Sequence, residues 1–581
     1  MRTPRRPAAR YTATQPVDLP DRTWPGRTVT AAPRWLSTDL RDGNQSLAEP
    51  MDPTRKLTMF NLLVDMGYKE IEVGFPVASQ DDHDFLRMLI EEDLIPDDVR
   101  ISVLTQARDE LIHRTVESLA GAPRATVHIY NATSPTFRDL VFGMTRDECK
   151  DLAVQATRLL TKYAERALGG CDLGYQYSPE LFNDTEQDFA LEVCEAVMDV
   201  WQPGPGRGII LNFPTTVERS MPNVFADRIE WLDRNLSRRE HVCLSIHPHN
   251  DRGTGVATAE LALLAGAERI EGCLFGNGER AGNVDLVTLG LNLLTQGVDP
   301  GIDFSDLDGI RRTVEYCNGI AVHPRHPYGG DLVYTAFSGS HQDAIKKGFD
   351  AQERAARIGG VSAHDLPWAV PYLPIDPRDV GRTYEAVVRI NSQSGKGGVA
   401  YVMDAWHGMR LPRALQVEFA GIVQADADAG GGEITPRRVR ELFDREYLAE
   451  PGLTMPAAPV TAELHIDGLG FDAGRSEAVR RMAATLAPWG IDVRAVHRTG
   501  RRSPSREVVV YAECRVRGRL VWGAGTGSDV EAAAFAAVSA AASREMASRE
   551  AASRDSASRD SASRESASFE VADRSPAAAV R

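Results

Sequence analysis

The chain has 581 residues, a formal net charge of −16 and an ordinary globular composition. This length predicts two to four domains with a large core. The acidic balance argues against a nucleic-acid or anionic-membrane partner. Seven scattered cysteines without a C-x-x-C pair indicate a reducing cytosol and argue against a disulfide framework or a zinc finger. Because neither a membrane-span pattern nor a signal-peptide core is apparent, we expect a cytoplasmic protein.

Residues 1–33 are rich in Arg, Pro and Thr and poor in acid. A transit peptide can share that composition, but no amphipathic helix is evident. We therefore expect an N-terminal arm that is at least partly ordered.

From residue 34 onward, short β-branched runs alternate with longer amphipathic ones. The expected strands are Trp35–Asp39, Glu70–Gly74, Arg100–Leu104, Ala125–Tyr130, Cys171–Tyr177, Gly208–Phe213, His241–Ile246 and Arg269–Phe275. The expected helices are Thr54–Met66, Asp81–Glu92, Asp109–Ala120, Arg146–Ala167, Glu186–Trp201, Val224–Asn235, Gly255–Ala265 and Val284–Leu294. This α/β alternation predicts a parallel sheet, and eight units match a TIM (β/α)8 barrel over 34–300. A doubly wound sheet is the alternative, disfavoured by the repeat count and by the absence of G-x-G-x-x-G after the first strand.

Three further regions follow the barrel. Residues 301–455 are mostly helical in pattern with Pro-rich interruptions, which predicts small helical subdomains, and 451–459 reads as a linker. Residues 460–542 predict a separate α+β domain, with strands at Thr461–Ile466, Ile491–His497, Glu507–Arg515 and Leu520–Ala524 and helices at Arg475–Leu486 and Val530–Ala542. A five-residue repeat of Ser, Arg and acid then fits neither a helix nor a strand, so we expect residues 543–581 to be disordered.

The segment S-I-H-P-H-N-D-R at 245–252 carries the first sign of chemistry. His247 and His249 are two residues apart at the end of an expected strand, which places both imidazoles on one face. Imidazole is a common ligand of divalent metals, so this pair would make half of a site. A lone His-x-His also arises by chance, and the other ligands must come from elsewhere in the chain.

Active sites of TIM barrels lie at the C-terminal ends of the strands. Arg41 and Asp42 follow the first strand, although an Arg-Asp dipeptide is commonly a surface ion pair. His128 ends the fourth strand, where a histidine can equally be a core residue. Three further candidate segments follow strands five, six and eight: Tyr177–Glu180, Phe213–Glu218 and the glycine-rich Phe275–Asn283.

Asp42, His247 and His249 together offer one carboxylate and two imidazoles. Mixed N/O ligation suits Mg²⁺, Mn²⁺, Co²⁺ or Zn²⁺ without choosing among them. A 2-oxo acid can fill two open positions, and the metal then acts as a Lewis acid on its carbonyl. Arg41 could stabilise the alkoxide that develops there.

Three motifs now occur in a diagnostic order: L-R-D-G-N-Q at 40–45, H-P-H-N-D at 247–251 and G-N-G-E-R-A-G-N at 276–283. They resemble the Claisen-type acyl-CoA synthases and related lyases. The stretches at 370–384 and 391–398 narrow the resemblance to the 2-isopropylmalate synthase family, in its long actinobacterial-type form. The resemblance is strong over residues 20–455 and weak over 460–542.

The resemblance implies that acetyl-CoA, 3-methyl-2-oxobutanoate and water give 2-isopropylmalate and CoA, the first committed step of leucine biosynthesis. It implies a homodimer, activation by K⁺, and a divalent metal, foremost Mg²⁺, on Asp42, His247 and His249 with Asn283 as a further ligand. The resemblance further implies that Arg41 polarises the keto oxygen and that His128 and Thr216 bind the carboxylate of the oxo acid. Glu180 and His341 would form the base system. His341 and Tyr372 would both reach the site from the partner subunit. A helical-core role is the alternative for His341 and Tyr372.

The C-terminal domain departs from the family pattern. Its first loop reads D-G-L-G-F-D-A-G at 467–474 where the family often has Gly-x-Gly-Asn-Gly-Pro, and Asp529 stands where the family's second loop is usually apolar. We therefore expect a regulatory domain with weak or no response to leucine, unless Asp472 and Asp529 only cap helices.

Several alternatives remain. Homocitrate and citramalate synthases differ in the pocket for the oxo-acid side chain, and residues 370–398 favour isopropylmalate over both. A barrel lyase acting on a CoA ester would not need residues 301–542. A non-catalytic binding protein would be expected to have lost a ligand among Asp42, His247, His249 and Asn283.

Overall fold

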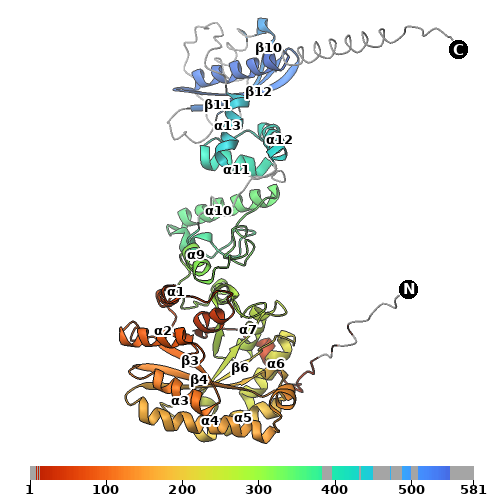
Figure 1. Ribbon diagram of the computed structural model, residues 1–581. Coiled ribbons are helices and arrows are strands. Elements are labelled where there is room, and N and C mark those ends of the chain that lie inside the picture. Colours follow the sequence, from red (N-terminus) through yellow and green to blue (C-terminus); the bar gives the residue numbers. More distant parts are fainter. Residues whose placement is uncertain are drawn as a thin grey trace, which may run out of the picture. The chain divides into compact units, whose positions relative to one another are not determined.

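The computed structural model describes residues 8, 11, 14–382, 396–430, 434–448, 471–472, 484, 487–498 and 508–549. It consists of two compact units, one formed by Met1–Val333 with Ile375–Thr383 and the other by Tyr334–Pro374 with Tyr384–Arg581. The first unit contains the barrel, and the second contains a smaller sheet with its helices (Figure 1).

Eight parallel strands close into a barrel in sequence order. They are β1 (Arg34–Ser37), β2 (Glu70–Gly74), β3 (Arg100–Gln106), β4 (Arg124–Ala132), β5 (Asp172–Glu180), β6 (Ile209–Pro214), β7 (Val242–His247) and β8 (Arg269–Gly272). β1 closes the ring by pairing with both β2 and β8, where Leu36 lies opposite Glu70 and Trp35 opposite Ile270. The predicted TIM barrel is confirmed, and the doubly wound alternative is excluded.

Helices follow the strands and surround the barrel in Figure 1. They are α1 (Pro53–Met66), α2 (Gln80–Glu91), α3 (Asp109–Ser118), α4 (Arg146–Ala167), α5 (Gln187–Trp201), α6 (Pro222–Asn235), α7 (Gly255–Leu264) and α8 (Leu286–Thr295). Local capping residues set where these helices begin and end. Thr145 and Glu148 form a capping box at the start of α4, and the left-handed Gly67 ends α1.

The described part of the N-terminal arm packs against α6. Arg22 forms two hydrogen bonds with Asp227, at 2.8 and 2.9 Å, and the Trp24 indole donates to the same carboxylate at 2.8 Å. The backbone N–H groups of Thr23 and Trp24 donate to Glu230. The arm therefore supplies the partners for two carboxylates that are almost fully buried.

The barrel unit extends beyond residue 300, whereas the sequence pattern placed all of 301–455 with the helical subdomains. α9 (Leu307–Asn318) belongs to the barrel unit. It is tied to α1, because Arg55 Nη1 donates to the Cys317 carbonyl at 3.3 Å and the Cys317 thiol donates to the Arg55 carbonyl at 3.4 Å. Such contacts between distant segments leave no local signal in the sequence.

The second unit combines helices with a four-stranded antiparallel sheet of order β12-β11-β10-β9. Its elements are α10 (Gly339–Gly359), α11 (Lys396–His407), α12 (Arg413–Gly430), α13 (Pro436–Tyr447), β9 (Phe471–Asp472), β10 (Ile491–Arg498), β11 (Val508–Val516), β12 (Arg519–Gly527) and a helix over 530–549. The predicted strand Thr461–Ile466 and helix Arg475–Leu486 fall almost wholly outside the described residues.

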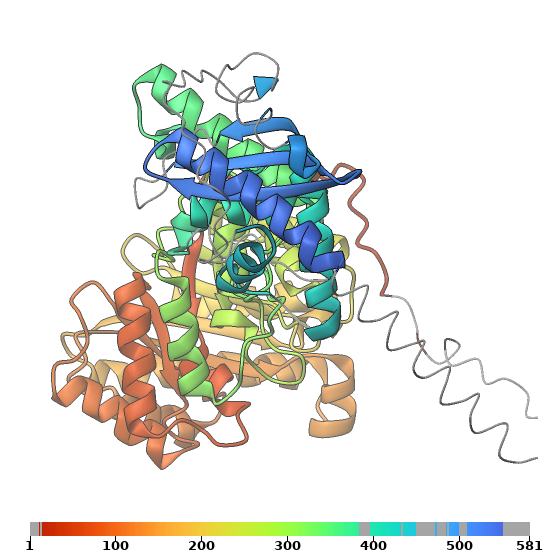
Figure 2. The same cartoon turned by 90° about the horizontal axis from the view of Figure 1, so that it is seen from above.

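The middle of β11 is buried on both of its faces. Val509 and Tyr511 of β11 pack into one apolar cluster with α11, α12 and α13, whereas Val510 and Ala512 pack into another with helix 530–549. Figures 1 and 2 show the dark-blue helix lying across the sheet. On that side β12 carries glycines at which a Cβ would lie 2.8 Å or less from the helix backbone, namely Gly523, Gly525 and Gly527.

Helix 530–549 continues seven residues beyond the predicted end at Ala542, so the prediction of disorder was wrong for 543–549. Arg544 contacts Glu418 of α12 at 2.5 Å and lies over the Tyr447 ring of α13 at 4.5 Å. Glu545 is 3% exposed and pairs with Arg549 at 2.8 Å. These tertiary contacts hold the start of the repeat in a helix despite its five-residue period.

Ending the chain after Ala542 should therefore destabilise the second unit. The variant loses the Arg544 and Glu545 contacts, and about 1 kcal/mol in a domain of this size corresponds to roughly 2–4 °C in melting temperature. A chain ending after Arg549 keeps every one of these contacts and serves as the control. Thermal unfolding followed by circular dichroism compares the two, and identical transitions would contradict a stabilising role for residues 543–549.

Candidate active site

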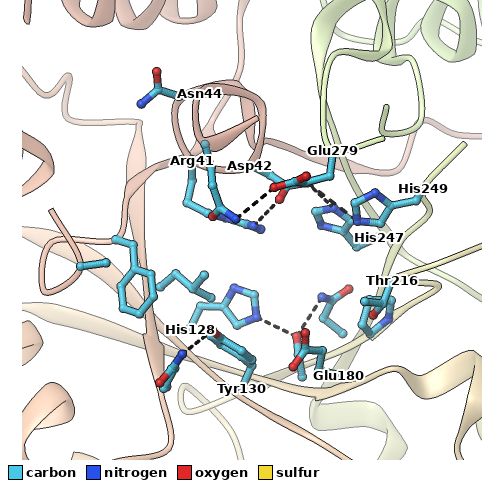
Figure 3. A pocket seen from close by; sticks show the side chains of 18 of the residues that line it. Arg41, Asp42, Asn44, His128, Tyr130, Glu180, Thr216, His247, His249 and Glu279 are labelled. Carbon is cyan, nitrogen blue, oxygen red and sulfur yellow. Dashed lines mark hydrogen bonds and ion pairs between the residues drawn. The ribbon is translucent and has the colours of Figure 1, made fainter. Parts of the chain in front are cut away.

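The C-terminal ends of the barrel strands surround a cavity of about 730 Å³. The predicted site residues that line it are Arg41, Asp42, His128, Glu180, Thr216, His247 and His249. Figure 3 shows Arg41, Asp42, His247 and His249 along one side of the cavity and His128, Glu180 and Thr216 along the other. Barrel closure therefore gathers residues from five different strand ends into one site.

Arg41 and Asp42 lie in η3 (Asp39–Gly43), a π-helical turn that follows β1. Such turns occur frequently at functional sites. Arg41 Nη1 donates to Asp42 Oδ1 at 2.8 Å, and Arg41 Nε donates to Glu72 Oε2 at 2.5 Å. Two carboxylates thus fix the guanidinium beside the cavity.

Asp42, His247 and His249 form a buried cluster whose candidate ligand atoms all lie within 4.8 Å of one another. Asp42 Oδ2 lies 3.3 Å from His247 Nε2 and 3.8 Å from His249 Nε2. The two imidazole centroids are 5.2 Å apart. His247 ends β7 and His249 lies two residues further on, so both imidazole rings face the Asp42 carboxylate.

Asn283 adjoins the cluster, although it is not among the residues that line the cavity. It is fully buried, and its Oδ1 lies 3.0 Å from His247 Nε2. The backbone forms an antiparallel bridge between His249 and Asn283, which brings the glycine-rich segment after β8 against the end of β7. All four predicted ligands are thus adjacent.

Charge in the cluster is divided unequally. Burial would lower the pKa of His247, but interactions with Asp42 and Glu271 outweigh burial and raise the pKa to about 9. Burial, followed by the positive charge of His247, lowers the pKa of His249 to about 3. Burial would raise the pKa of Asp42, but Arg41 and His247 hold it well below its usual range. At neutral pH the proton of the cluster therefore resides on His247, beside the Asp42 carboxylate, and His249 stays neutral.

These residues fit a divalent cation. Asp42 Oδ2 is buried and accepts no well-formed hydrogen bond from any residue in the described part of the chain. It faces two imidazole nitrogens, and this N/O donor set suits first-row divalent metals and Mg²⁺. A cation can satisfy the carboxylate oxygen and replace the proton on His247.

Two buried glutamates behind the site were missed in the sequence. Glu72 on β2 connects Arg41 to His128, whose Nδ1 lies 2.8 Å from Glu72 Oε1. Glu271 on β8 lies 3.1 Å from His247 Nδ1. Both glutamates have no exposed surface. The available signal was a charged residue at alternate positions within short buried strands, E-I-E-V-G and R-I-E-G, which marks side chains pointing into the barrel.

The opposite side of the cavity carries polar groups for a substrate. His128 Nε2 lies 2.7 Å from Ser178 Oγ, and Thr216 Oγ1 accepts a hydrogen bond from Leu181 N at 3.0 Å, which leaves the Thr216 hydroxyl proton free to donate. Burial raises the pKa of Glu180, and the charge of Arg41 opposes that rise without cancelling it. Glu180 is thus more basic than an exposed glutamate.

Comparison with known proteins decides the family. The HMGL-like family model matches residues 32–314, and the model described as "Alpha-isopropylmalate synthase, post-catalytic domain-like" matches residues 331–404. The chain is 74% identical to the 2-isopropylmalate synthase of Streptosporangium roseum over 554 residues, which cover 94% of this chain and 96% of that protein.

The chain belongs to the 2-isopropylmalate synthase family.

Other relatives agree with this assignment and confirm the predicted resemblance. The 2-isopropylmalate synthase of Thermobifida fusca is 59% identical over 557 residues, covering 93% of this chain and 98% of that protein. That of Cupriavidus taiwanensis is 60% identical over 467 residues, covering 80% of each. Across the described residues, we find no helix with the length and apolar character needed to span a membrane.

Two site residues predicted from the 2-isopropylmalate synthase family lie in the second unit. His341 is near the start of α10, and its ring stacks on that of Tyr372 with centroids 4.0 Å apart. Both side chains are exposed, and Tyr372 adopts a positive φ of 64°. The stacking joins two residues that sequence spacing alone would not have paired.

The prediction of weak leucine feedback rested on Asp472 and Asp529, and the structure gives a side-chain contact for Asp529. Asp529 Oδ1 accepts from Ala532 N at 2.8 Å, and this hydrogen bond lowers the pKa of Asp529. Its carboxylate is therefore an N-cap of helix 530–549, as the capping alternative supposed. The side chain of Asp472 lies outside the described residues. Weak leucine feedback stays a prediction whose electrostatic support now rests on Asp472 alone.

Proposed function

We propose that this chain is a metal-dependent 2-isopropylmalate synthase that uses the barrel cavity to join acetyl-CoA to 3-methyl-2-oxobutanoate. The observation that carries the proposal is the buried Asp42, His247 and His249 cluster in a chain of this family. The acetyl methyl carbon bonds to the keto carbon, and water then cleaves the thioester to release CoA. The names of the relatives favour this oxo acid over those of homocitrate or citramalate synthases.

Asp42, His247, His249 and Asn283 would hold the divalent cation, with Mg²⁺ as the first candidate before Mn²⁺, Co²⁺ and Zn²⁺, and K⁺ as a further activator. When bound, such a cation polarises the keto group of the oxo acid. Glu271 would orient His247 from behind, since a carboxylate that accepts from one ring nitrogen leaves the other free for a metal.

Arg41 would stabilise the negative charge that develops on the keto oxygen, because its guanidinium is held at the cavity by two carboxylates. Glu180, helped by His341, would take a proton from the acetyl methyl group, for which the raised pKa of its buried carboxylate is suited. Tyr372, stacked on His341, would support that base system.

Thr216 and His128 would hold the carboxylate of the oxo acid. The Thr216 hydroxyl retains a proton to donate, because it accepts from Leu181 N. His128 Nε2 is already bonded to Ser178 Oγ, so a carboxylate ligand would replace that bond. We further propose a cytoplasmic homodimer in which the partner subunit supplies His341 and Tyr372.

The test is release of free CoA thiol from acetyl-CoA against a panel of 2-oxo acids. We expect 3-methyl-2-oxobutanoate to exceed pyruvate and 2-oxoglutarate in kcat/KM by about tenfold or more, the range that side-chain fit in an apolar pocket can supply. EDTA should abolish release, and added Mg²⁺ or Mn²⁺ should restore it. A preference for another oxo acid would reassign the substrate, and full activity in metal-free buffer would remove the metal from the proposal.

A further inference from the structure

Thr216 and Arg280, which line the cavity, and Leu181, which follows the cavity-lining Glu180, have an unusual backbone. Leu181, Thr216 and Arg280 adopt positive φ angles of 60°, 43° and 56°. They follow β5, β6 and β8, and none is a glycine. The left-handed region is unfavourable for residues with a Cβ, above all for a β-branched threonine, and it persists only where the surroundings impose it.

Hydrogen bonds connect these three residues in series. Thr216 Oγ1 accepts from the Leu181 N–H at 3.0 Å, and the Thr216 carbonyl accepts from Arg280 Nη2 at 2.5 Å. Thr216 is therefore the middle residue of the series, because its hydroxyl bonds to Leu181 and its carbonyl bonds to Arg280. Glu180 directly precedes Leu181, so the same series bears on the position of the proposed base.

Asp251 fixes the outer end of the series. Its Oδ1 accepts from Arg280 Nε at 2.7 Å and its Oδ2 from Arg280 Nη2 at 3.2 Å. Asp251 Oδ2 also accepts from the Glu218 N–H at 2.8 Å, and Asp251 itself follows β7. One guanidinium and one carboxylate thus join the rim segments after β6, β7 and β8, and Thr216 extends the connection to β5.

We propose that Arg280 and Asp251 form a latch that positions Thr216 and Glu180 and thereby sets the affinity of the site for the 2-oxo acid. The proposal rests on the function proposed above. Arg280 lines the cavity, but its guanidinium is engaged by Asp251 and by the Thr216 carbonyl. It is therefore a positioning residue, because it acts on the substrate through Thr216.

A direct role of Arg280 as a ligand of the substrate carboxylate makes a different prediction. Asp251→Asn removes the partner charge but leaves the arginine in place. If Arg280 bound the substrate itself, this change would leave the KM for the oxo acid unchanged or lower it. The latch predicts a higher KM, because the guanidinium is no longer held against the Thr216 carbonyl.

The experiment compares Arg280→Ala, Arg280→Lys and Asp251→Asn with the unmodified chain by steady-state CoA release. We expect the KM for 3-methyl-2-oxobutanoate to rise about tenfold in each variant, the effect of losing a hydrogen bond to a charged group. The KM for acetyl-CoA should stay within about twofold. Lysine should not rescue, because one ammonium cannot reproduce the planar fork that reaches both Asp251 and Thr216.

Arg239 offers a matched control at the other end of the barrel. Its Nε donates to Asp233 at 2.8 Å and its Nη1 to the Val242 carbonyl at 2.7 Å, so it also joins a carboxylate to a backbone carbonyl. It lies before β7 at the N-terminal face of the barrel, away from the active-site end, where contacts serve stability. Arg239→Ala should lower the melting temperature without changing either KM.

Hydrogen exchange gives a readout that needs no turnover. The Leu181 amide, which donates to Thr216, should exchange faster in Arg280→Ala and at the original rate in Arg239→Ala. An unchanged Leu181 amide, an unchanged oxo-acid KM in Asp251→Asn, or an equal KM rise in Arg239→Ala would each overturn the latch. Absence of CoA release from the unmodified chain would instead overturn the proposed function, while the exchange experiment still decides the latch.

Discussion

Replacing His247 with alanine should reduce CoA release to the background rate. The change removes one of two imidazoles that face Asp42 Oδ2, and it leaves Glu271 without the ring that it contacts at 3.1 Å. Loss of a metal ligand costs more than loss of the groups behind it, so we expect divalent-metal affinity to fall by more than about a hundredfold. Mn²⁺ binding followed by electron paramagnetic resonance measures that affinity independently of turnover.

The matched control is His241→Ala. His241 lies just before β7, at the opposite end of the same strand, and has no contact with the metal cluster among the described residues. It should retain full activity and metal affinity. If His247→Ala bound Mn²⁺ as tightly as the control, the cluster would not be the metal site.

Arg41→Lys should lower kcat by about a hundredfold, as for the loss of a preorganised oxyanion donor. Arg41 donates through Nε to Glu72 and through Nη1 to Asp42. A lysine keeps the charge but has one nitrogen, which cannot take both positions and still face the substrate. Because the change removes none of the four proposed metal ligands and acts at the keto oxygen of the oxo acid, the KM for acetyl-CoA should change little.

Arg100→Lys controls for the loss of a guanidinium fork in the same barrel. Arg100 begins β3 at the N-terminal face and donates to the backbone carbonyls of Ala125 and Asp172. Its replacement should leave kcat unchanged. An equally unchanged kcat in Arg41→Lys would assign Arg41 to a structural ion pair, which is the commoner role of an Arg-Asp dipeptide.

The barrel was predictable because its strands are short apolar runs separated by amphipathic helices. β2 occupies Glu70–Gly74 and α4 occupies Arg146–Ala167, both as predicted, and the other barrel elements differ by a few residues at their ends. The rule that barrel sites follow the strands then placed Asp42, His128 and His247 correctly at one cavity. Alternation and strand order are local properties, so a single sequence suffices to find them.

The groups behind the cavity were not predictable in the same way. Glu72 and Glu271 lie inside strands, and their importance follows from partners that come from other strands, such as Arg41 and His247. Which inward-facing charges meet depends on strand register, which composition does not encode. Likewise, helix 530–549 passes its predicted end because Arg544 reaches Glu418 of α12, a contact made only in the folded unit.

The small sheet has a consequence for how its strands find their alignment. A strand with one solvent-exposed face resists a one-residue shift of its pairing register, because the shift would bury its polar side chains. β12 lacks that safeguard, since Trp522 and Ala524 enter one apolar cluster while the intervening Gly523 lies against helix 530–549. A shift of one residue would direct Trp522 toward a helix that already excludes a single methyl group. The register of β12 is therefore specified by side-chain size. The difference in size between glycine and tryptophan fixes it, whereas in half-exposed strands the difference between polar and apolar side chains does so.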